Sequence, residues 1–194
     1  MQSRTIPRLR LLPAIAAALA IMAAAAGILL WMGRIPYCAC GTIKLWHNHA
    51  NDAETSQHFA DWYTYSHVLH GVIFYWILWA IFRGRLSVAA RLVIAMLMEA
   101  AWEIFENTSF IIERYRAQTV SRTYTGDSVI NSVGDMLATL FGFLVTARLP
   151  VWLTVVLLIA TEVTMLVLLR DNLILNIIML VYPLEAIRQW QAAG

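Results

Sequence analysis

Charged residues are scarce in this sequence. Asp, Glu, Lys and Arg make up 13% of the 194 residues, whereas 60% are hydrophobic and the net charge is +2. A soluble domain carries about 25% charged residues, so this composition excludes an ordinary soluble protein. Lysine is represented by Lys44 alone. No basic cluster with interleaved aromatic residues indicates nucleic-acid binding, and nucleic acid is therefore not an expected partner.

Cysteine and recognisable catalytic motifs are equally rare. The only cysteines are Cys38 and Cys40, in "YCACG". A disulfide between residues two apart in sequence is strained, so we expect free thiols, with a metal or redox role as the alternative. The sequence contains no P-loop, no GxGxxG and no GxSxG elbow. It therefore lacks the signatures of nucleotide-binding folds and of α/β-hydrolases.

Long apolar runs occupy most of the chain instead. They approach 20 residues, the length of a transmembrane helix, and they do not alternate as the strands of a membrane β-barrel do. The sequence predicts an all-α polytopic transmembrane bundle forming one domain over 1–194. About six spans are expected, the last of them short or re-entrant: 11–32, 66–82, 88–112, 128–147, 151–169 and 173–187.

Basic residues indicate the orientation of these spans. Arg4, Arg8 and Arg10 precede the first span, and Arg83 and Arg85 lie in the turn after the second. Positive residues favour the cytoplasmic side, which predicts a cytoplasmic N-terminus, both termini inside and a location in the inner (plasma) membrane. The first apolar run is longer than the roughly 7–15 residues of a signal-peptide core, so we expect an uncleaved span.

Polar residues interrupt three of the spans at helical spacing. Residues three, four, seven and eight apart share one helix face, so each set forms a stripe. A charge at the bilayer centre costs about 3 kcal/mol, which predicts that the stripes face the bundle interior in its outer half. The stripes are His67 and His70; Glu99, Glu103, Glu106 and Asn107; and Asp127, Asn131 and Asp135.

The stripes suggest a divalent metal site. Carboxylates with one or two imidazoles suit Mg, Mn, Fe or Zn. The predicted ligands are His67, His70, Glu99, Glu103, Glu106 and Asp135, and the predicted catalytic residues are Glu103, Asp127 and Asp135. Guanidinium groups match phosphate oxygens, so substrate binding is assigned to Arg114, Arg116 and Arg122 of the following loop, with Asn131.

Other polar segments have simpler interpretations. The same stripes could serve only as a satisfied polar network that locks three helices. The loop "HNHANDAETSQHFAD" holds metal-competent side chains, but a solvated surface is the expected state of this loop. Arg170 and Asp171 are expected to form an ion pair at the membrane interface.

Two family resemblances follow from these segments. "LWHNHANDAETSQHFADWYTYSHVLHG", "MEAAWEIFENTSFIIERYR" and "TYTGDSVINSVGD" resemble the uncharacterised multi-pass membrane family UPF0314, also called domain of unknown function 2585. This resemblance implies a plasma-membrane location and carries no assigned activity. A looser similarity is to VanZ-like membrane proteins, whose His, Glu and Asp/Asn/Gly pattern would correspond to His67 or His70, Glu99 or Glu103, and Asp127, Asn131, Gly134 and Asp135.

Three functions are compatible with these features. The first is a metal-dependent membrane enzyme that acts on a lipid or polyprenyl-phosphate head group at the outer leaflet. The second is a small proton-coupled transporter, since buried carboxylates are typical of proton relays. The third is a non-catalytic assembly or structural factor. The sequence predicts the lipid bilayer as a partner and leaves the oligomeric state open.

Overall fold

The computed structural model describes residues 8–83 and 85–193, which form eight α-helices and no β-strand. The all-helical fold is therefore confirmed. The helices are α1 (Arg8–Trp31), α2 (Thr64–Phe82), α3 (Val88–Glu106), α4 (Ser109–Gln118), α5 (Val129–Thr146), α6 (Val151–Leu169), α7 (Leu173–Val181) and α8 (Glu185–Ala192).

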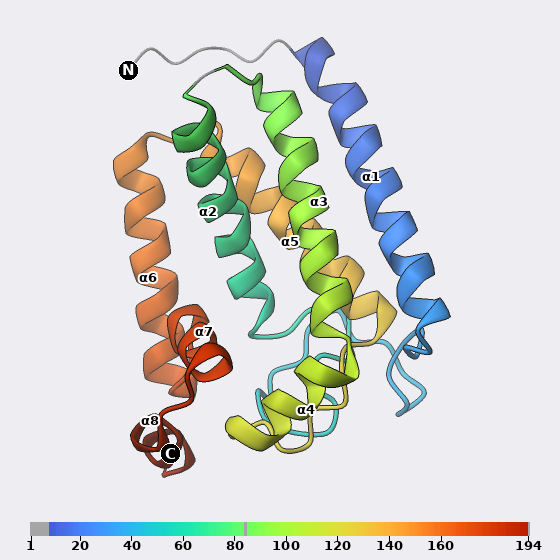
Figure 1. Cartoon of the computed structure of the whole chain (residues 1–194), viewed down its shortest axis with the longest axis vertical. Coiled ribbons are helices and arrows are strands. Elements are labelled where there is room, and N and C mark those ends of the chain that lie inside the picture. Colours follow the sequence, from blue (N-terminus) through green and yellow to red (C-terminus); the bar gives the residue numbers. More distant parts are fainter. Residues whose placement is uncertain (1–7, 84, 194) are drawn as a thin grey trace.

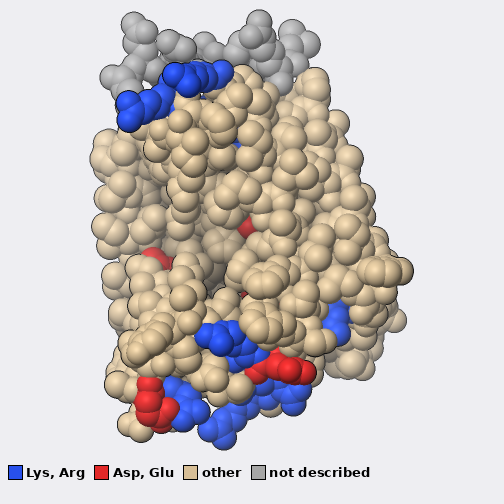
Figure 2. Space-filling view, in the orientation of Figure 1, with Lys and Arg blue, Asp and Glu red and all other residues tan. Residues whose placement is uncertain are grey.

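Four of these helices, α1, α2, α5 and α6, are long and apolar enough to cross a membrane. Figure 1 shows them in one bundle with α3, which has the length of α2 and α6 but carries more charge. In Figure 2 the Lys and Arg side chains gather at the two ends of the molecule, and the band between them is almost free of charge on this face. The fold is thus compatible with a membrane, although the predicted number of six spans is not confirmed.

The third predicted span is interrupted after Glu106. The Asn107 amide donates both to the Glu103 carbonyl, at 3.0 Å, and to Asp127 Oδ2, at 2.9 Å, while the Asp127 N–H donates to Asn107 Oδ1 at 2.7 Å. Thr108 then adopts an extended backbone, and its hydroxyl donates to the Phe105 carbonyl at 2.6 Å. These contacts end the helix, so the predicted span over 88–112 is wrong beyond Glu106, and α4 is a separate helix.

The last apolar run does not form one helix over 173–187. The carboxylate of Glu162 in α6 accepts the N–H groups of Leu173 and Ile174, at 3.1 and 3.2 Å, so it caps the start of α7. Nine residues rise about 14 Å at 1.5 Å each, about half of a 30 Å hydrocarbon core. Figure 1 shows α7 and α8 toward the end of the bundle opposite the start of α1. The prediction that both termini lie on the cytoplasmic side is therefore not confirmed.

Helices α2 and α5 approach each other through glycines. A Cβ on Gly71 of α2 would overlap the carbonyl oxygen of Thr139, and one on Gly142 of α5 would overlap that of Val68. Small residues of this kind let helix backbones pack closely in a membrane. Phe143, fully buried, fills the same interface and meets Tyr75 edge to face at 5.2 Å. This contact places the polar stripe of α5 beside the histidines of α2.

We predict that Gly142→Ala destabilises the bundle. The added methyl has no space against the Val68 carbonyl, so α2 and α5 must separate. Overpacking of this kind costs about 1–3 kcal/mol, which thermal unfolding in mild detergent would measure. Gly27→Ala in α1 is the matched control because no atom lies within 4 Å of its added Cβ. Equal effects of the two substitutions would contradict close packing of α2 on α5.

Candidate functional site

The histidines of α2 meet the acidic stripe of α3. His67 Nδ1 lies 2.6 Å from Glu99 Oε1, and His70 Nδ1 lies 3.0 Å from Glu99 Oε2. Glu99 is fully buried and His67 is 8% exposed. The two imidazoles are neighbours because residues three apart share one helix face. A buried carboxylate thus has a histidine on each of its two oxygens.

Two further carboxylates face His67 from different helices. Glu103 Oε1 of α3 lies 3.4 Å from His67 Nδ1, and Asp135 Oδ2 of α5 lies 3.8 Å from His67 Nε2. Neither Glu103 oxygen has a hydrogen-bond partner, and neither does Asp135 Oδ1, although all three atoms are buried. Buried polar atoms normally have partners, because leaving them without one costs about 1–3 kcal/mol or more. These oxygens are therefore available to a cation or a proton.

This arrangement offers two overlapping sets of metal-competent side chains. His67, His70 and Glu99 form one set, and His67, Glu103 and Asp135 form the other. Within each set the potential ligand atoms lie within 4.8 Å of one another. The structure thus brings together five of the six predicted metal ligands; Glu106, the sixth, is partly exposed and lies in the wall of the adjoining cavity.

A cavity connects this cluster to the polar end of the bundle. It is partly open to solvent, and its volume is about 80 Å³. Figure 2 shows acidic atoms inside a hollow of the otherwise uncharged band. The walls combine acidic groups with aromatic side chains that were not among the predicted site residues. They include His67, His70, Glu106, Asp127, Asp135 and Asp171, together with Tyr63, Trp102, Tyr115 and Tyr124.

For two of these aromatic residues, the spacing from an acidic residue of a stripe indicates a position near the site. Trp102 lies three residues after Glu99, on the face of α3 that carries the acidic stripe. Tyr124 precedes Asp127 by three residues, and its hydroxyl donates to Asp127 Oδ1 at 2.9 Å. Tyr115 and Tyr63 had no such signal, because their position depends on how α4 and the loop before α2 fold.

Asp127 lies at the start of α5, apart from the histidine cluster. Burial raises the pKa of its carboxyl, while the hydrogen bonds from Asn107 and Tyr124 oppose that rise. Asn131, one turn further along, donates from Nδ2 to the backbone carbonyl of His58 at 2.9 Å. Asp127 therefore lines the cavity, whereas the predicted substrate-binding residue Asn131 holds the loop that precedes α2.

The predicted arginine clamp is not assembled. The Arg114 guanidinium donates to the backbone carbonyls of Leu180 and Val181, at the end of α7. Arg116 and Arg122 line a separate, open depression with Glu113. Among the described residues that line the acidic cavity there is no Arg or Lys. Arg114 thus ties α7 to α4.

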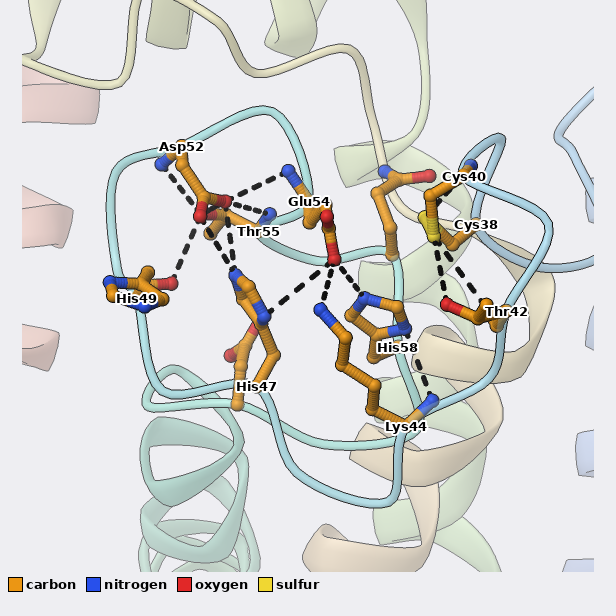
Figure 3. A network of polar contacts seen from close by, with 12 residues as sticks. Cys38, Cys40, Thr42, Lys44, His47, His49, Asp52, Glu54, Thr55 and His58 are labelled. Carbon is orange, nitrogen blue, oxygen red and sulfur yellow. Dashed lines mark hydrogen bonds and ion pairs between the residues drawn. A yellow bond between two sulfur atoms is a disulfide. The ribbon is translucent and has the colours of Figure 1, made fainter.

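The loop between α1 and α2 is folded, which corrects the expected solvated surface. Figure 3 shows its polar network. His47 and His58 are 3% and 0% exposed, and His47 Nε2 lies 3.0 Å from Asp52 Oδ1. Glu54 binds the Lys44 ammonium and lies 2.7 Å from His58 Nε2. These contacts with Lys44 and His58 lower the pKa of Glu54 to about 2.

The two cysteines of this loop form a disulfide, Cys38–Cys40. The expectation of free thiols is therefore wrong. The backbone N–H of Cys40 donates to Cys38 Sγ at 3.1 Å, and Cys38 is 3% exposed. Cys40 is exposed and faces Thr42.

Asp171 does not pair with Arg170 as predicted. Arg170 donates to the Trp190 carbonyl at 2.9 Å instead. Asp171 instead accepts four hydrogen bonds, from the Tyr63 hydroxyl, the Asn172 N–H and the side-chain amides of Asn176 and Gln191. It thereby joins the start of α2 to the C-terminal helices. Burial nevertheless raises the pKa of Asp171 to about 6.

We predict that Asp171 makes folding pH-dependent. A carboxyl whose pKa is higher in the folded protein than in the unfolded chain, here about 6 against 3.8, stabilises the fold at low pH. That contribution is lost as the pH rises from about 4 to 6, and two pKa units correspond to about 3 kcal/mol. In detergent, the free energy of unfolding of Asp171→Asn should fall less over this pH range than that of the wild-type protein. Glu185→Gln, at an exposed acid, is the control, and identical profiles for wild type and Asp171→Asn would refute the role of Asp171.

Comparison with known proteins places this structure in a family. The fold and the site define an all-helical protein with membrane-compatible helices around a buried His–carboxylate cluster. A family described as "Protein of unknown function (DUF2585)" matches residues 29–193, and the chain belongs to this family. The looser similarity to VanZ-like proteins stays a prediction.

Bacterial relatives of the chain share most of its length. It is 57% identical to a UPF0314 protein of Paracoccus denitrificans, over 85% of each chain. It is 51% identical to a UPF0314 protein of Brucella anthropi, over 90% of this chain and 88% of the relative. For a UPF0314 protein of Sphingopyxis alaskensis the identity is 49%, over 91% and 94% respectively. No solved structure matches the chain.

Proposed function

We propose that this protein is a multi-pass enzyme of the bacterial inner (plasma) membrane that depends on a divalent metal. The crossing helices are α1, α2, α3, α5 and α6. We count α3 as a crossing helix although it carries charged residues. Its Arg91, Glu99 and Glu103 are 5%, 0% and 0% exposed. They therefore face other helices and not lipid. The arginine-rich start of the chain and the α2–α3 turn support a cytoplasmic N-terminus.

The disulfide gives independent support for this orientation. Disulfides persist in oxidising compartments outside the cytoplasm. Cys38–Cys40 lies just after α1, at the end of the bundle that holds α4. An outward-facing Cys38–Cys40 supports a cytoplasmic start of α1. The acidic cavity then opens toward the outer side of the membrane.

The buried oxygens of Glu103 and Asp135 without partners are the observation that carries the proposal. His67 Nδ1 contacts Glu99 at 2.6 Å, which orients the ring and directs Nε2 toward Asp135. A carboxylate on the distal nitrogen is the usual support of a metal-binding histidine. We therefore assign the metal to His67, Glu103 and Asp135, with Glu99 and His70 as the supporting pair.

Such a metal would supply hydrolytic chemistry. A bound divalent ion lowers the pKa of water and polarises a phosphoryl oxygen. The substrate would be a lipid or polyprenyl-phosphate head group that enters from the outer leaflet past Tyr115 and Tyr124. Asp127, in the same cavity wall, is the candidate to receive a proton. Because Arg114 is bonded to α7, the metal itself would bind the phosphate.

We predict one equivalent of divalent metal in the protein purified in mild detergent under oxidising conditions. Asp135→Asn removes a charged ligand, so the metal content measured by elemental analysis should fall to about a tenth or less. Glu162→Gln is the matched control: Glu162 is also buried, but it binds the start of α7. We expect this variant to retain its metal.

The same measurement distinguishes the alternatives. Wild-type protein without metal, with Asp135→Asn merely less stable, would contradict the enzyme proposal and favour a structural or proton-bearing network. Metal lost equally from Asp135→Asn and Glu162→Gln would mean that binding depends on overall folding and not on the assigned ligands.

A further inference from the structure

A second set of metal-competent side chains lies in the outer loop, outside the cavity already described. Cys38, Cys40, Glu54 and His58 each offer a ligand atom, and these atoms lie within 4.8 Å of one another. Figure 3 shows the two cysteines at one end of the polar network, next to Thr42, and Glu54 and His58 nearer its middle, next to Lys44. Two sulfurs, an imidazole and a carboxylate are typical ligands of a tetrahedral zinc ion.

The loop backbone holds this set in place. The N–H of Phe59 donates to the Lys44 carbonyl at 3.1 Å, which brings the two arms of the loop together. Asn131 of α5 holds the His58 carbonyl, and Gln57 Nε2 donates to the Gly126 carbonyl at 2.7 Å. These contacts order the arm of the loop that carries His58, so folding already meets the cost of ordering that arm.

The four ligands differ in their exposure to solvent. Cys38 and His58 are 3% and 0% exposed, whereas Cys40 is exposed and Glu54 is partly exposed. An ion would reach the buried pair from the side of Cys40. The Lys44 ammonium binds Glu54, the other ligand with exposed surface.

Charge also suits a divalent ion. Two thiolates and one carboxylate carry three negative charges, which a divalent ion and the Lys44 ammonium together neutralise. Lys44 is the only lysine of the chain, and it binds one of the four candidate ligands. Soft sulfur ligands favour zinc over magnesium or calcium.

We propose that the outer loop is a redox-controlled zinc site, formed by Cys38, Cys40, Glu54 and His58 when the Cys38–Cys40 disulfide is reduced. The thiolate is the form of cysteine that binds metal, so the disulfide form lacks two of the four ligands. Reduction opens the site, and exchange with the disulfide form of a dithiol donor, which takes back the two electrons, closes it. The proposal is independent of the metal assigned to the bundle.

We assign the redox step to a dithiol donor. A thiolate of the donor attacks one sulfur of the disulfide, which gives a mixed disulfide and releases the other cysteine as a thiolate. The second thiol of the donor then closes the donor's own disulfide and releases the second cysteine. The donor loses two electrons, and Cys38 and Cys40 gain them. Zinc binding afterwards releases the thiol protons to solvent.

Zinc binding to the full chain in mild detergent, before and after reduction, tests this proposal. The reductant is a phosphine, removed without air before zinc alone is added. We expect reduction to add one equivalent of bound zinc. Cys40→Ser, at an exposed position, should abolish this increment, and His58→Gln should weaken binding at least about tenfold. His49→Gln is the matched control, because His49 is exposed in the same loop and outside the set.

The zinc that is bound only after reduction distinguishes the loop site from the site in the bundle. In Asp135→Asn the zinc added by reduction should persist, even if the metal of the oxidised protein is lost. Equal zinc binding before and after reduction would overturn the proposal. So would an increment that survives in Cys40→Ser, or one that disappears in Asp135→Asn or His49→Gln.

Discussion

The pairing of His67 with buried carboxylates is the interaction on which the rest of the structure depends. Glu99, Glu103 and Asp135 approach one imidazole from two helices, and each carboxylate alone would be unfavourable among apolar helices. Three like charges also repel one another, so the group requires a compensating positive charge. Helices α2, α3 and α5 must therefore meet at this level, and the glycines between α2 and α5 make the approach possible.

The loop before α2 folds onto the start of α5. Ser128 donates from its hydroxyl to the Gln57 carbonyl at 3.0 Å, and Asn131 binds the next carbonyl, that of His58. Gly134 faces the Phe59 carbonyl with no space for a side chain. The stripe of α5 thus has two functions: Asp135 faces the histidine cluster, while Asn131 holds the loop in which the cysteines lie. The two candidate metal sites share one scaffold.

Much of the bundle could be predicted from the sequence, because apolar runs and helical spacing are local properties. The predicted span at 151–169 coincides with α6, and the spacing of Glu99 and Glu103 puts both beside His67. The break after Glu106 was not predictable in this way, because it depends on the pairing of Asn107 with Asp127, twenty residues later. Arg114 was assigned to a phosphate because its partners, backbone carbonyls of α7, have no signature in the sequence.

The most direct test of this account is X-ray absorption spectroscopy of the oxidised protein loaded with one zinc ion. We predict imidazole nitrogen and carboxylate oxygen around the metal and no sulfur, because the disulfide keeps the cysteines from binding. The imidazole signal should disappear in His67→Gln and remain in His58→Gln. A coordination sphere of sulfur, or one that is unchanged in His67→Gln, would contradict the assignment of His67 as the central ligand.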